Sequence, residues 1–207
     1  MDAPDPLARL RAALARPMDP RDAPSSDFDL NPGAAPPAGR PLREAAVLVA
    51  VEPRPERGSS GPVVWLTQRS SALRHHPGQV AFPGGKLEPE DASPEDAALR
   101  EAWEEIALPP GDVEVLGSLP PHETVTGFRI TPVVGVVLRP FEPRPEAGEV
   151  AEAFTVPLRH LADPASYAVR SRLWRGTARR YYVAPWGPHY VWGATARIAR
   201  ALAARLA

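Results

Sequence analysis

The sequence predicts an α+β domain built around a mixed β-sheet. Segments with strand character dominate the middle of the 207-residue chain, whereas helical segments lie before and after them. Hydrophobic residues make up 43% of the chain and charged residues 24%, so a sizeable core is expected. The length fits one domain with extensions. Because strands and helices do not alternate regularly, we do not expect a doubly wound fold.

The N-terminal part, residues 1–43, is expected to be an extension that precedes the main domain at 44–207. Residues 6–16, "PLARLRAALAR", carry leucines at helical spacing and predict a short amphipathic helix. Residues 17–43 are rich in proline and aspartate and offer little core, so we expect them to run extended along the surface.

The main domain is expected to begin with two antiparallel strands, at 44–53 and 62–69, joined by a turn. A long connection rich in glycine and proline follows at 70–92, and connections of this length inside a compact domain usually carry function. A helix is then expected at 94–107. Downstream, the patterns predict strands at 113–119 and 128–138, a short helix with an irregular tail at 149–163, a hairpin formed by 167–175 and 180–185, and a strand end that leads into a terminal helix at 190–206.

Composition excludes several classes of function. The net charge of −1 produces no overall field that would attract nucleic acid or an anionic membrane. The absence of cysteine excludes disulfides, zinc–thiolate sites and thiol nucleophiles. The longest apolar runs, at 45–51 and 133–137, are too short to span a bilayer, and the first residues match neither a signal peptide nor a transit peptide. We therefore expect a cytoplasmic protein whose partner is a small molecule, not nucleic acid or a membrane.

The stretch "SPEDAALREAWEEIAL" at 93–108 concentrates acidic charge on one predicted helix. Glu101, Glu104 and Glu105 fall within five positions, and each close pair of like charges on a helix costs a few tenths of a kcal/mol. Ser93 is expected to cap this helix and Pro94 to occupy its first position. The expected apolar face, which anchors the helix and leaves the glutamates pointing away from that contact, consists of Leu99, Ala102, Trp103 and Ile106.

Two interpretations fit this acidic helix when it is taken alone. Charge runs usually form a solvated face. Alternatively, carboxylates one turn apart can share Mg²⁺ or Mn²⁺. The glycine-rich turn "FPGGKLEPED" at 82–91 favours the second interpretation, because Gly84 or Gly85 could turn a backbone carbonyl toward the same cation.

The stretch from Gly85 through "LREAWEEIAL" resembles the signature of the Nudix hydrolases, a glycine loop followed by a helix with Arg-Glu, an apolar residue, any residue and Glu-Glu. The resemblance implies a Nudix-type α/β/α sandwich over 44–207. It also implies hydrolysis of nucleoside diphosphates linked to another moiety, with Mg²⁺ or Mn²⁺. The residues it assigns to metal binding or catalysis are Glu101, Glu104, Glu105, the Gly84 carbonyl and Arg100, with Glu104 as a metal ligand or a water-activating base and Arg100 orienting a glutamate.

Two departures from the family pattern stand out. The segment from Gly85 to Arg100 is one residue longer than usual, so the acid normally found in the loop is either Glu90 or Asp91. Ala107 stands where the pattern has glycine, and we expect only a minor packing change from it.

Residues 66–91, "LTQRSSALRHHPGQVAFPGGKLEPED", resemble a motif of the coenzyme A pyrophosphatases, and 119–137 and 192–196 also resemble that subfamily. Coenzyme A carries a 3′-phosphate besides its pyrophosphate, so its site needs cations beyond the metal. The arginines of this loop could instead pair with the acidic helix or with Glu88. The expected substrate contacts are Arg69, Arg74, His76, Gln79 and Gly85.

Several alternatives stay open from sequence. The substrate could be ADP-ribose or NADH, or the domain could sense a nucleotide without turnover. A base from outside the helix is also open, with His122 and Glu123 as the candidates. The apolar face of the C-terminal helix either closes the domain or serves a homodimer.

Overall fold

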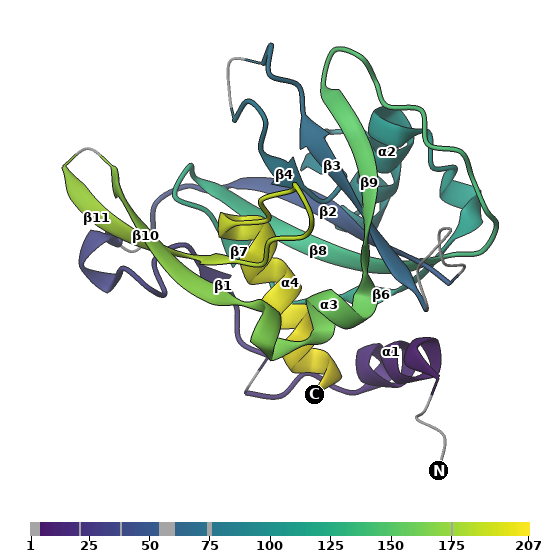
Figure 1. Cartoon of the computed structure of the whole chain (residues 1–207), viewed down its shortest axis with the longest axis horizontal. Helices are drawn as coiled ribbons and strands as arrows, with labels where there is room; N and C mark the ends of the chain where they lie inside the picture. Colours follow the sequence, from purple (N-terminus) through teal and green to yellow (C-terminus); the bar gives the residue numbers. More distant parts are fainter. Residues whose placement is uncertain (1–4, 21, 38, 54–60, 74–75, 175) are drawn as a thin grey trace.

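The computed structural model describes residues 5–20, 22–37, 39–53, 61–73, 76–174 and 176–207 (Figure 1). Its centre is a nine-stranded sheet with the main order β1-β7-β8-β2-β3-β4. The strands β2 (Arg43–Glu52) and β8 (Phe128–Val137) run parallel, whereas β3 (Val63–Arg69) is antiparallel to β2. The predicted α+β class with a mixed sheet is therefore confirmed.

The other elements flank these three strands. In chain order they are α1 (Pro6–Ala15), β1 (Ser25–Ser26), η1 (Pro32–Ala34), β4 (Val80–Ala81), β5 (Gly84–Lys86), α2 (Pro94–Ile106), η2 (Pro110–Asp112), β6 (Val113–Ser118), β7 (His122–Glu123), β9 (Val150–Pro157), α3 (Leu158–Ala162), η3 (Pro164–Ser166), β10 (Ala168–Trp174), β11 (Thr177–Val183) and α4 (Gly193–Leu206). Among the described residues, none of the helices combines the length and apolarity needed to cross a membrane.

Helices cover both faces of the sheet, which makes the fold an α/β/α sandwich. Side chains alternate along β2, so Leu48 packs in one core with α2 residues such as Ala102, while Val49 packs in the other with α4 residues such as Leu202. All four of these side chains are fully buried. The apolar face of α4 thus closes the domain.

The N-terminal segment differs from the extended surface run expected for 17–43. Strand β1 pairs in parallel with β7, with Ser25 opposite His122, and Phe28 is buried. Arg205, in the last turn of α4, is buried and bonds the carboxylate of Asp22. The described residues of this segment therefore join the sheet and hold the C-terminal helix.

The helix predicted at 149–163 is wrong over most of its length. Residues Val150–Pro157 form strand β9 and pair with the whole of β3, and only Leu158–Ala162 are helical. Alanine and glutamate favour helix weakly, but burial of the "FTVP" end against β3 decides the outcome because packing overrides propensity. This strand matters for the site, since Glu149 immediately precedes it.

Helix α2 ends at Ala107, which adopts a left-handed conformation with φ of 59°. The Leu108 N–H then bonds the Ala102 carbonyl, a helix ending that normally uses glycine. We expect Ala107→Gly to stabilise the protein by about 1 kcal/mol, because the Cβ strain is removed. Thermal unfolding of both proteins measures this. Ala12→Gly, at an exposed position inside α1, should have the opposite sign, and a destabilised Ala107→Gly protein would contradict the strain argument.

Candidate active site

Helix α2 begins as its sequence predicts. The Ser93 hydroxyl accepts a hydrogen bond from the Asp96 N–H at 3.1 Å, and Pro94 occupies the first helical position. The last turn packs through Ile106, which is fully buried. The helix therefore holds its carboxylates at fixed positions against the sheet.

The three glutamates do not share one solvent-facing side, which corrects the expected helix faces. Glu105 is only 5% exposed and lies on the buried side of α2, two turns after Ala98 on the same face. Trp103, expected in the apolar contact, is instead 47% exposed. The centre of the predicted apolar face lies about 100° around the helix from the centre of the observed buried face. The two differ because alanines, and not large side chains, form most of the contact with the sheet and leave room there for the Glu105 carboxylate.

Glu105 is the most perturbed carboxyl of the helix. The backbone N–H of Gly84 donates to its Oε2 at 3.3 Å. Burial, and then the neighbouring charge of Glu101, raise the pKa of Glu105 to about 8, while Gly84 and the nearby charge of Arg69 act in the opposite direction. A buried carboxylate with this environment is poised to gain from a cation.

Glu101 lies one turn before Glu105 and directly over Gly85. A Cβ atom on Gly85 would come within 2.2 Å of Glu101 Oε1, so only glycine leaves space for this carboxylate. Burial raises the pKa of Glu101, and the charge of Arg100 partly offsets this effect. The sequence predicts that the glycine loop lets the backbone come close to a ligand. In the structure, the missing side chain of Gly85 leaves space for the Glu101 carboxylate.

We expect Gly85→Ala to lower kcat/KM by about 10²-fold, because the new methyl group must displace the Glu101 carboxylate by an ångström or more. Steady-state hydrolysis at saturating metal measures the effect. Gly111→Ala is the matched control, since no atom lies within 4 Å of the added carbon there. Equal activity of the two variants would show that the position of Glu101 is not critical.

Arg100 connects the loop to the glutamates. Its guanidinium donates to both carboxylate oxygens of Asp91, at 3.0 and 2.9 Å, to Glu101 at 3.2 Å and to Glu104 at 3.1 Å. It also donates to the Lys86 carbonyl at 3.2 Å. The hydrogen bond from Arg100 lowers the pKa of Asp91. Of the two candidate loop acids, Asp91 is the one that hydrogen-bonds Arg100. Arg100 also contacts Glu101 and Glu104, and its role in orienting them stays a prediction.

The carboxylates of Glu101 and Glu105 suit a hard divalent cation. They are oxygen donors one helical turn apart, each lies against the backbone of the Gly84–Gly85 turn, and both have raised pKa values that a bound cation would reverse. In the described part of the chain no three His, Asp or Glu side chains converge as a complete ligand set. Glu104 is 54% exposed and bonded to Arg100, so Glu101 and Glu105 are the better placed pair.

Glu149 is a functional candidate that the sequence interpretation missed. Its charge contributes to the raised pKa of both Glu101 and Glu105, so its carboxylate lies within electrostatic range of this pair. It is exposed, immediately precedes β9, and its carbonyl accepts a hydrogen bond from the Ser70 N–H at 2.8 Å. Only the pairing of β9 with β3 brings it there, and the predicted helix concealed that pairing.

Three of the predicted substrate contacts, Arg69, His76 and Gln79, line a cavity of about 380 Å³. The carboxylates of α2 are not among its described lining residues, and Arg69 links the two, because its charge acts on Glu105. Arg74 lies outside the described residues. The Nε atom of Arg69 is buried and has no hydrogen-bond acceptor among the described residues. A buried N–H in this state offers a donor to an anionic ligand.

Much of the cavity wall was not predicted. Aromatic side chains and three arginines reach it from segments far along the chain, and the α4 residue Thr195 is tied to the Val80 carbonyl at 2.9 Å. The aromatic and arginine side chains that line it in addition to Arg69 are Phe82, Phe128, Arg172, Arg179, Arg180, Tyr181 and Trp192.

The two candidate bases outside the helix are engaged elsewhere. His122 is fully buried, with Nδ1 at 2.9 Å from the Ser25 hydroxyl and Nε2 at 3.2 Å from Asp27. Glu123 accepts two hydrogen bonds from Arg40, at 3.1 and 2.9 Å. Both residues hold the N-terminal segment to β7, which favours a structural role.

Comparison with known proteins identifies the family. The family model of the NUDIX domain matches residues 42–174. A protein of Escherichia coli K12 described as the uncharacterized Nudix hydrolase NudL is 44% identical over 164 residues, which cover 79% of this chain and 83% of the relative. A MutT/nudix family protein from Enterococcus faecalis is 15% identical and shares the fold with a TM-score of 0.50, covering 98% of this chain and 73% of its own.

The fold and the family match thus define a hydrolase. This chain belongs to the Nudix family and is a Nudix hydrolase, a class that generally needs divalent metal ions. The predicted family is confirmed.

Proposed function

We propose that this Nudix hydrolase cleaves the pyrophosphate of coenzyme A, or of a coenzyme A derivative, with Mg²⁺ or Mn²⁺. The products are 4′-phosphopantetheine and 3′,5′-ADP. One observation carries the proposal: the described part of the predicted substrate loop, Arg69, His76 and Gln79, lines the same cavity as three further arginines.

Charge favours a substrate with more than a pyrophosphate. Among the described residues lining the cavity, four arginines stand against one aspartate, which leaves an excess of three positive charges with histidine neutral. A divalent cation at Glu101 and Glu105 would already offset much of the pyrophosphate charge. The remaining positive charge suits an additional phosphate, and coenzyme A carries one on its ribose.

The reaction is an attack of water on one phosphorus, which breaks the bond from that phosphorus to the bridging oxygen. Glu101 and Glu105 would hold the divalent ion, with the Gly84 carbonyl as an adjoining donor; when bound, the ion offsets negative charge on the phosphate oxygens and acidifies a coordinated water. Glu149 or Glu104 accepts the proton of the attacking water. Arg69 donates to a phosphate oxygen, while Arg100 keeps Glu101 and Glu104 in place.

A role that only senses a nucleotide is less well supported. A buried Glu105 with a raised pKa destabilises the metal-free fold. A domain that only binds a nucleotide has no evident need for this carboxylate. Hydrolysis does give a reason, because the same carboxylate holds the ion that the reaction uses.

The test incubates the purified protein with Mg²⁺ or Mn²⁺ and coenzyme A, dephospho-coenzyme A, ADP-ribose and NADH, with products identified by mass. We expect metal-dependent release of 3′,5′-ADP from coenzyme A, lost in Glu105→Gln. Cleavage of ADP-ribose or NADH with coenzyme A untouched would reject the substrate and keep the hydrolase site. No turnover of any of the four compounds would favour the sensing role.

A further inference from the structure

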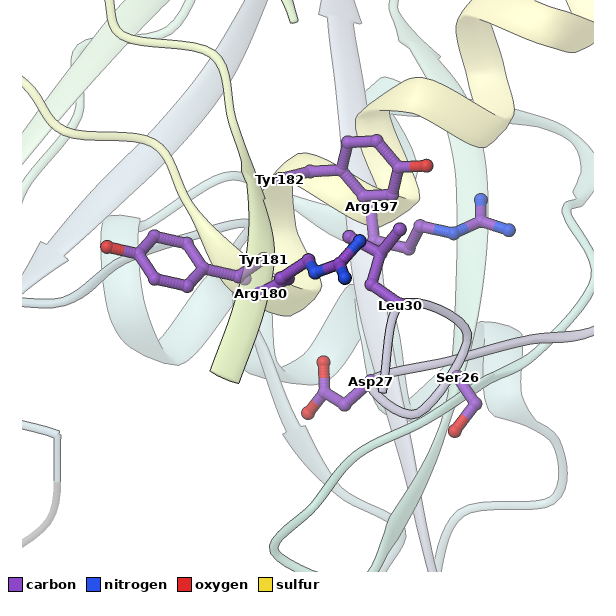
Figure 2. A pocket seen from close by; sticks show the side chains of 8 residues that line it. Ser26, Asp27, Leu30, Arg180, Tyr181, Tyr182 and Arg197 are labelled. Atoms are coloured by element: carbon purple, nitrogen blue, oxygen red, sulfur yellow. The ribbon is translucent and has the colours of Figure 1, made fainter. Parts of the chain in front are cut away.

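The N-terminal turn at 27–30 packs against strand β11 and the start of α4. Figure 2 shows this contact, with Leu30 of the turn beside Arg180 of β11 and Arg197 of α4. A small cavity of about 20 Å³ remains between the three elements. Two residues of the same segment, Asp27 and Asn31, also line the larger cavity of about 380 Å³. The N-terminal segment therefore packs on the hairpin and forms part of the cavity wall.

Asn31 joins this segment to β11 through its side-chain amide. Its Oδ1 accepts a hydrogen bond from the Arg180 N–H at 2.9 Å, and its Nδ2 donates to the Arg180 carbonyl at 2.8 Å. The same Nδ2 donates to the Asp27 carbonyl at 3.1 Å. Because a primary amide has two N–H groups, both donors of Asn31 are used within the protein. An effect of Asn31 on a ligand must therefore act through the strand that it holds.

The backbone groups that Asn31 binds lie at the outer edge of the hairpin. Arg180 is opposite Ser171 of β10. In an antiparallel pair, every second pair of opposite residues exchanges no backbone hydrogen bonds, and Arg180 belongs to such a pair because its N–H is bonded to Asn31. An open strand edge leaves groups of this kind unpaired. Asn31 thus takes the place of a neighbouring strand at this position.

This contact is separate from the attachment at the base of the hairpin. At the base, Val183 forms an antiparallel bridge with Trp192. Asn31 binds Arg180, three residues further toward the tip. A hairpin of two strands has little stability of its own. A second attachment away from the base therefore limits how far β11 can move relative to the main sheet.

The position of β11 determines the shape of the cavity. Arg179, Arg180 and Tyr181, which surround the Asn31 contact, all line it. The Tyr181 ring meets the ring of Trp192, another lining residue, edge-on at 5.4 Å. None of the described lining residues belongs to α2. A shift of β11 would therefore change the wall of the cavity and leave the carboxylates of α2 in place.

We propose that Asn31 is a positioning residue for substrate binding. It fixes β11 as a wall of the cavity and thereby raises the affinity for the substrate, without donating a hydrogen bond to it. The segment before the main domain is then a functional part of the substrate site. This inference rests on the proposed function in one respect, namely that the substrate of the hydrolase occupies this cavity.

The test compares Asn31→Ala with the wild type in steady-state hydrolysis of coenzyme A at saturating Mg²⁺. We expect KM to rise about 10-fold and kcat to stay within about 2-fold, because two hydrogen bonds that hold the wall are lost while the carboxylates of α2 keep their positions. Asn31→Leu keeps the branched shape of the side chain and loses the same hydrogen bonds, so its KM should rise equally.

Asp29→Asn is the matched control from the same segment. It removes the charge of an ion pair with Arg197, at 3.0 Å, and Asp29 does not line the cavity. We expect this variant to keep the wild-type KM. A KM that rises as much in Asp29→Asn as in Asn31→Ala would show that any loosening of the segment has this effect, and would overturn the specific role of Asn31.

A purely structural role of Asn31 gives a different result. Partial unfolding lowers the amount of active enzyme, so kcat falls and KM stays the same. Amide hydrogen exchange, measured by mass spectrometry on peptides that cover β11, should be faster in Asn31→Ala than in the wild type or in Asp29→Asn. An unchanged KM in both Asn31 variants, or unchanged exchange in β11, would overturn the inference.

Failure of the proposed function is distinguished by a separate result. If the wild type does not cleave coenzyme A, the same comparison uses the KM of whichever of ADP-ribose and NADH is cleaved, or the dissociation constants of all three compounds if none is. An affinity that falls in Asn31→Ala keeps the inference and rejects coenzyme A as the substrate. Cleavage of coenzyme A with the same KM in both proteins rejects the inference and keeps the reaction. A wild type that binds none of the three compounds rejects both.

Discussion

Glu105→Gln is expected to lower hydrolysis by about 10³-fold or more and, at the same time, to stabilise the metal-free protein. The loss of activity follows because glutamine removes the buried negative charge that would hold the divalent ion, and removing one preorganised charged group costs rates of this order. The gain in stability follows because Glu105 is only 5% exposed and its negative charge is repelled by that of Glu101, so removing the charge removes an unfavourable interaction from the folded state. The same substitution is thus expected to lower the rate of hydrolysis and to raise the free energy of unfolding.

The stability effect has a defined pH dependence. The pKa of Glu105 is about 8 in the folded protein, against an ordinary value of 4.5. Between these values the folded chain holds a proton that the unfolded chain has lost, so the free energy of unfolding falls as the pH rises through this window. Below pH 4.5 both states are protonated and the substitution changes little. Above pH 8 the full penalty applies, and we expect Glu105→Gln to gain roughly 2–4 kcal/mol.

Chemical denaturation in EDTA from pH 4 to pH 9 measures this difference. Glu104→Gln is the matched control for stability, because its carboxylate is on the same helix but 54% exposed and should show no comparable gain. A Glu105→Gln protein that is no more stable than the wild type at pH 9 would disprove the buried-charge argument. Adding Mg²⁺ should reduce the difference in unfolding free energy between Glu105→Gln and the wild type, because the ion stabilises only the wild type.

The sequence was sufficient for β2, β3, β8 and α2 because their signals are local. Continuous apolar runs rich in valine predict β2 and β3, and Ser93 with Pro94 predicts where α2 begins. The glycine loop and the glutamate spacing also lie within one short stretch, so their chemistry can be read without knowing the rest of the fold.

The parts that the sequence did not predict depend on contacts between distant segments. The burial of Glu105 arises because small alanines let α2 approach β2, a property of packing and not of periodicity. Glu149 reaches the site through the pairing of β9 with β3, and its segment has the composition of a helix. The arginines of the hairpin reach the cavity because Asn31 holds β11, at a separation of 149 residues.

Glu149→Gln is expected to lower kcat by about 10²-fold with KM for the nucleotide little changed. Its carboxylate is exposed to solvent, yet close enough to Glu101 and Glu105 to raise the pKa of both. It comes from the loop before β9 and not from α2, so it can face an attacking water from outside the carboxylate pair. General bases contribute 10²–10⁴-fold, and the amide of glutamine keeps the size of the side chain while losing its basicity.

Rates measured across a series of Mg²⁺ concentrations distinguish the two roles open to Glu149. If it accepts the proton of the attacking water, kcat falls at every concentration and the half-saturating Mg²⁺ concentration stays the same. If it binds the ion instead, that concentration rises and excess Mg²⁺ restores much of the rate. Glu142→Gln, an exposed glutamate in the preceding segment, should behave as the wild type in both measurements. Wild-type kinetics in Glu149→Gln would exclude both roles and leave Glu104 as the base, because that carboxylate is the exposed member of the helix and the one that a water molecule can reach.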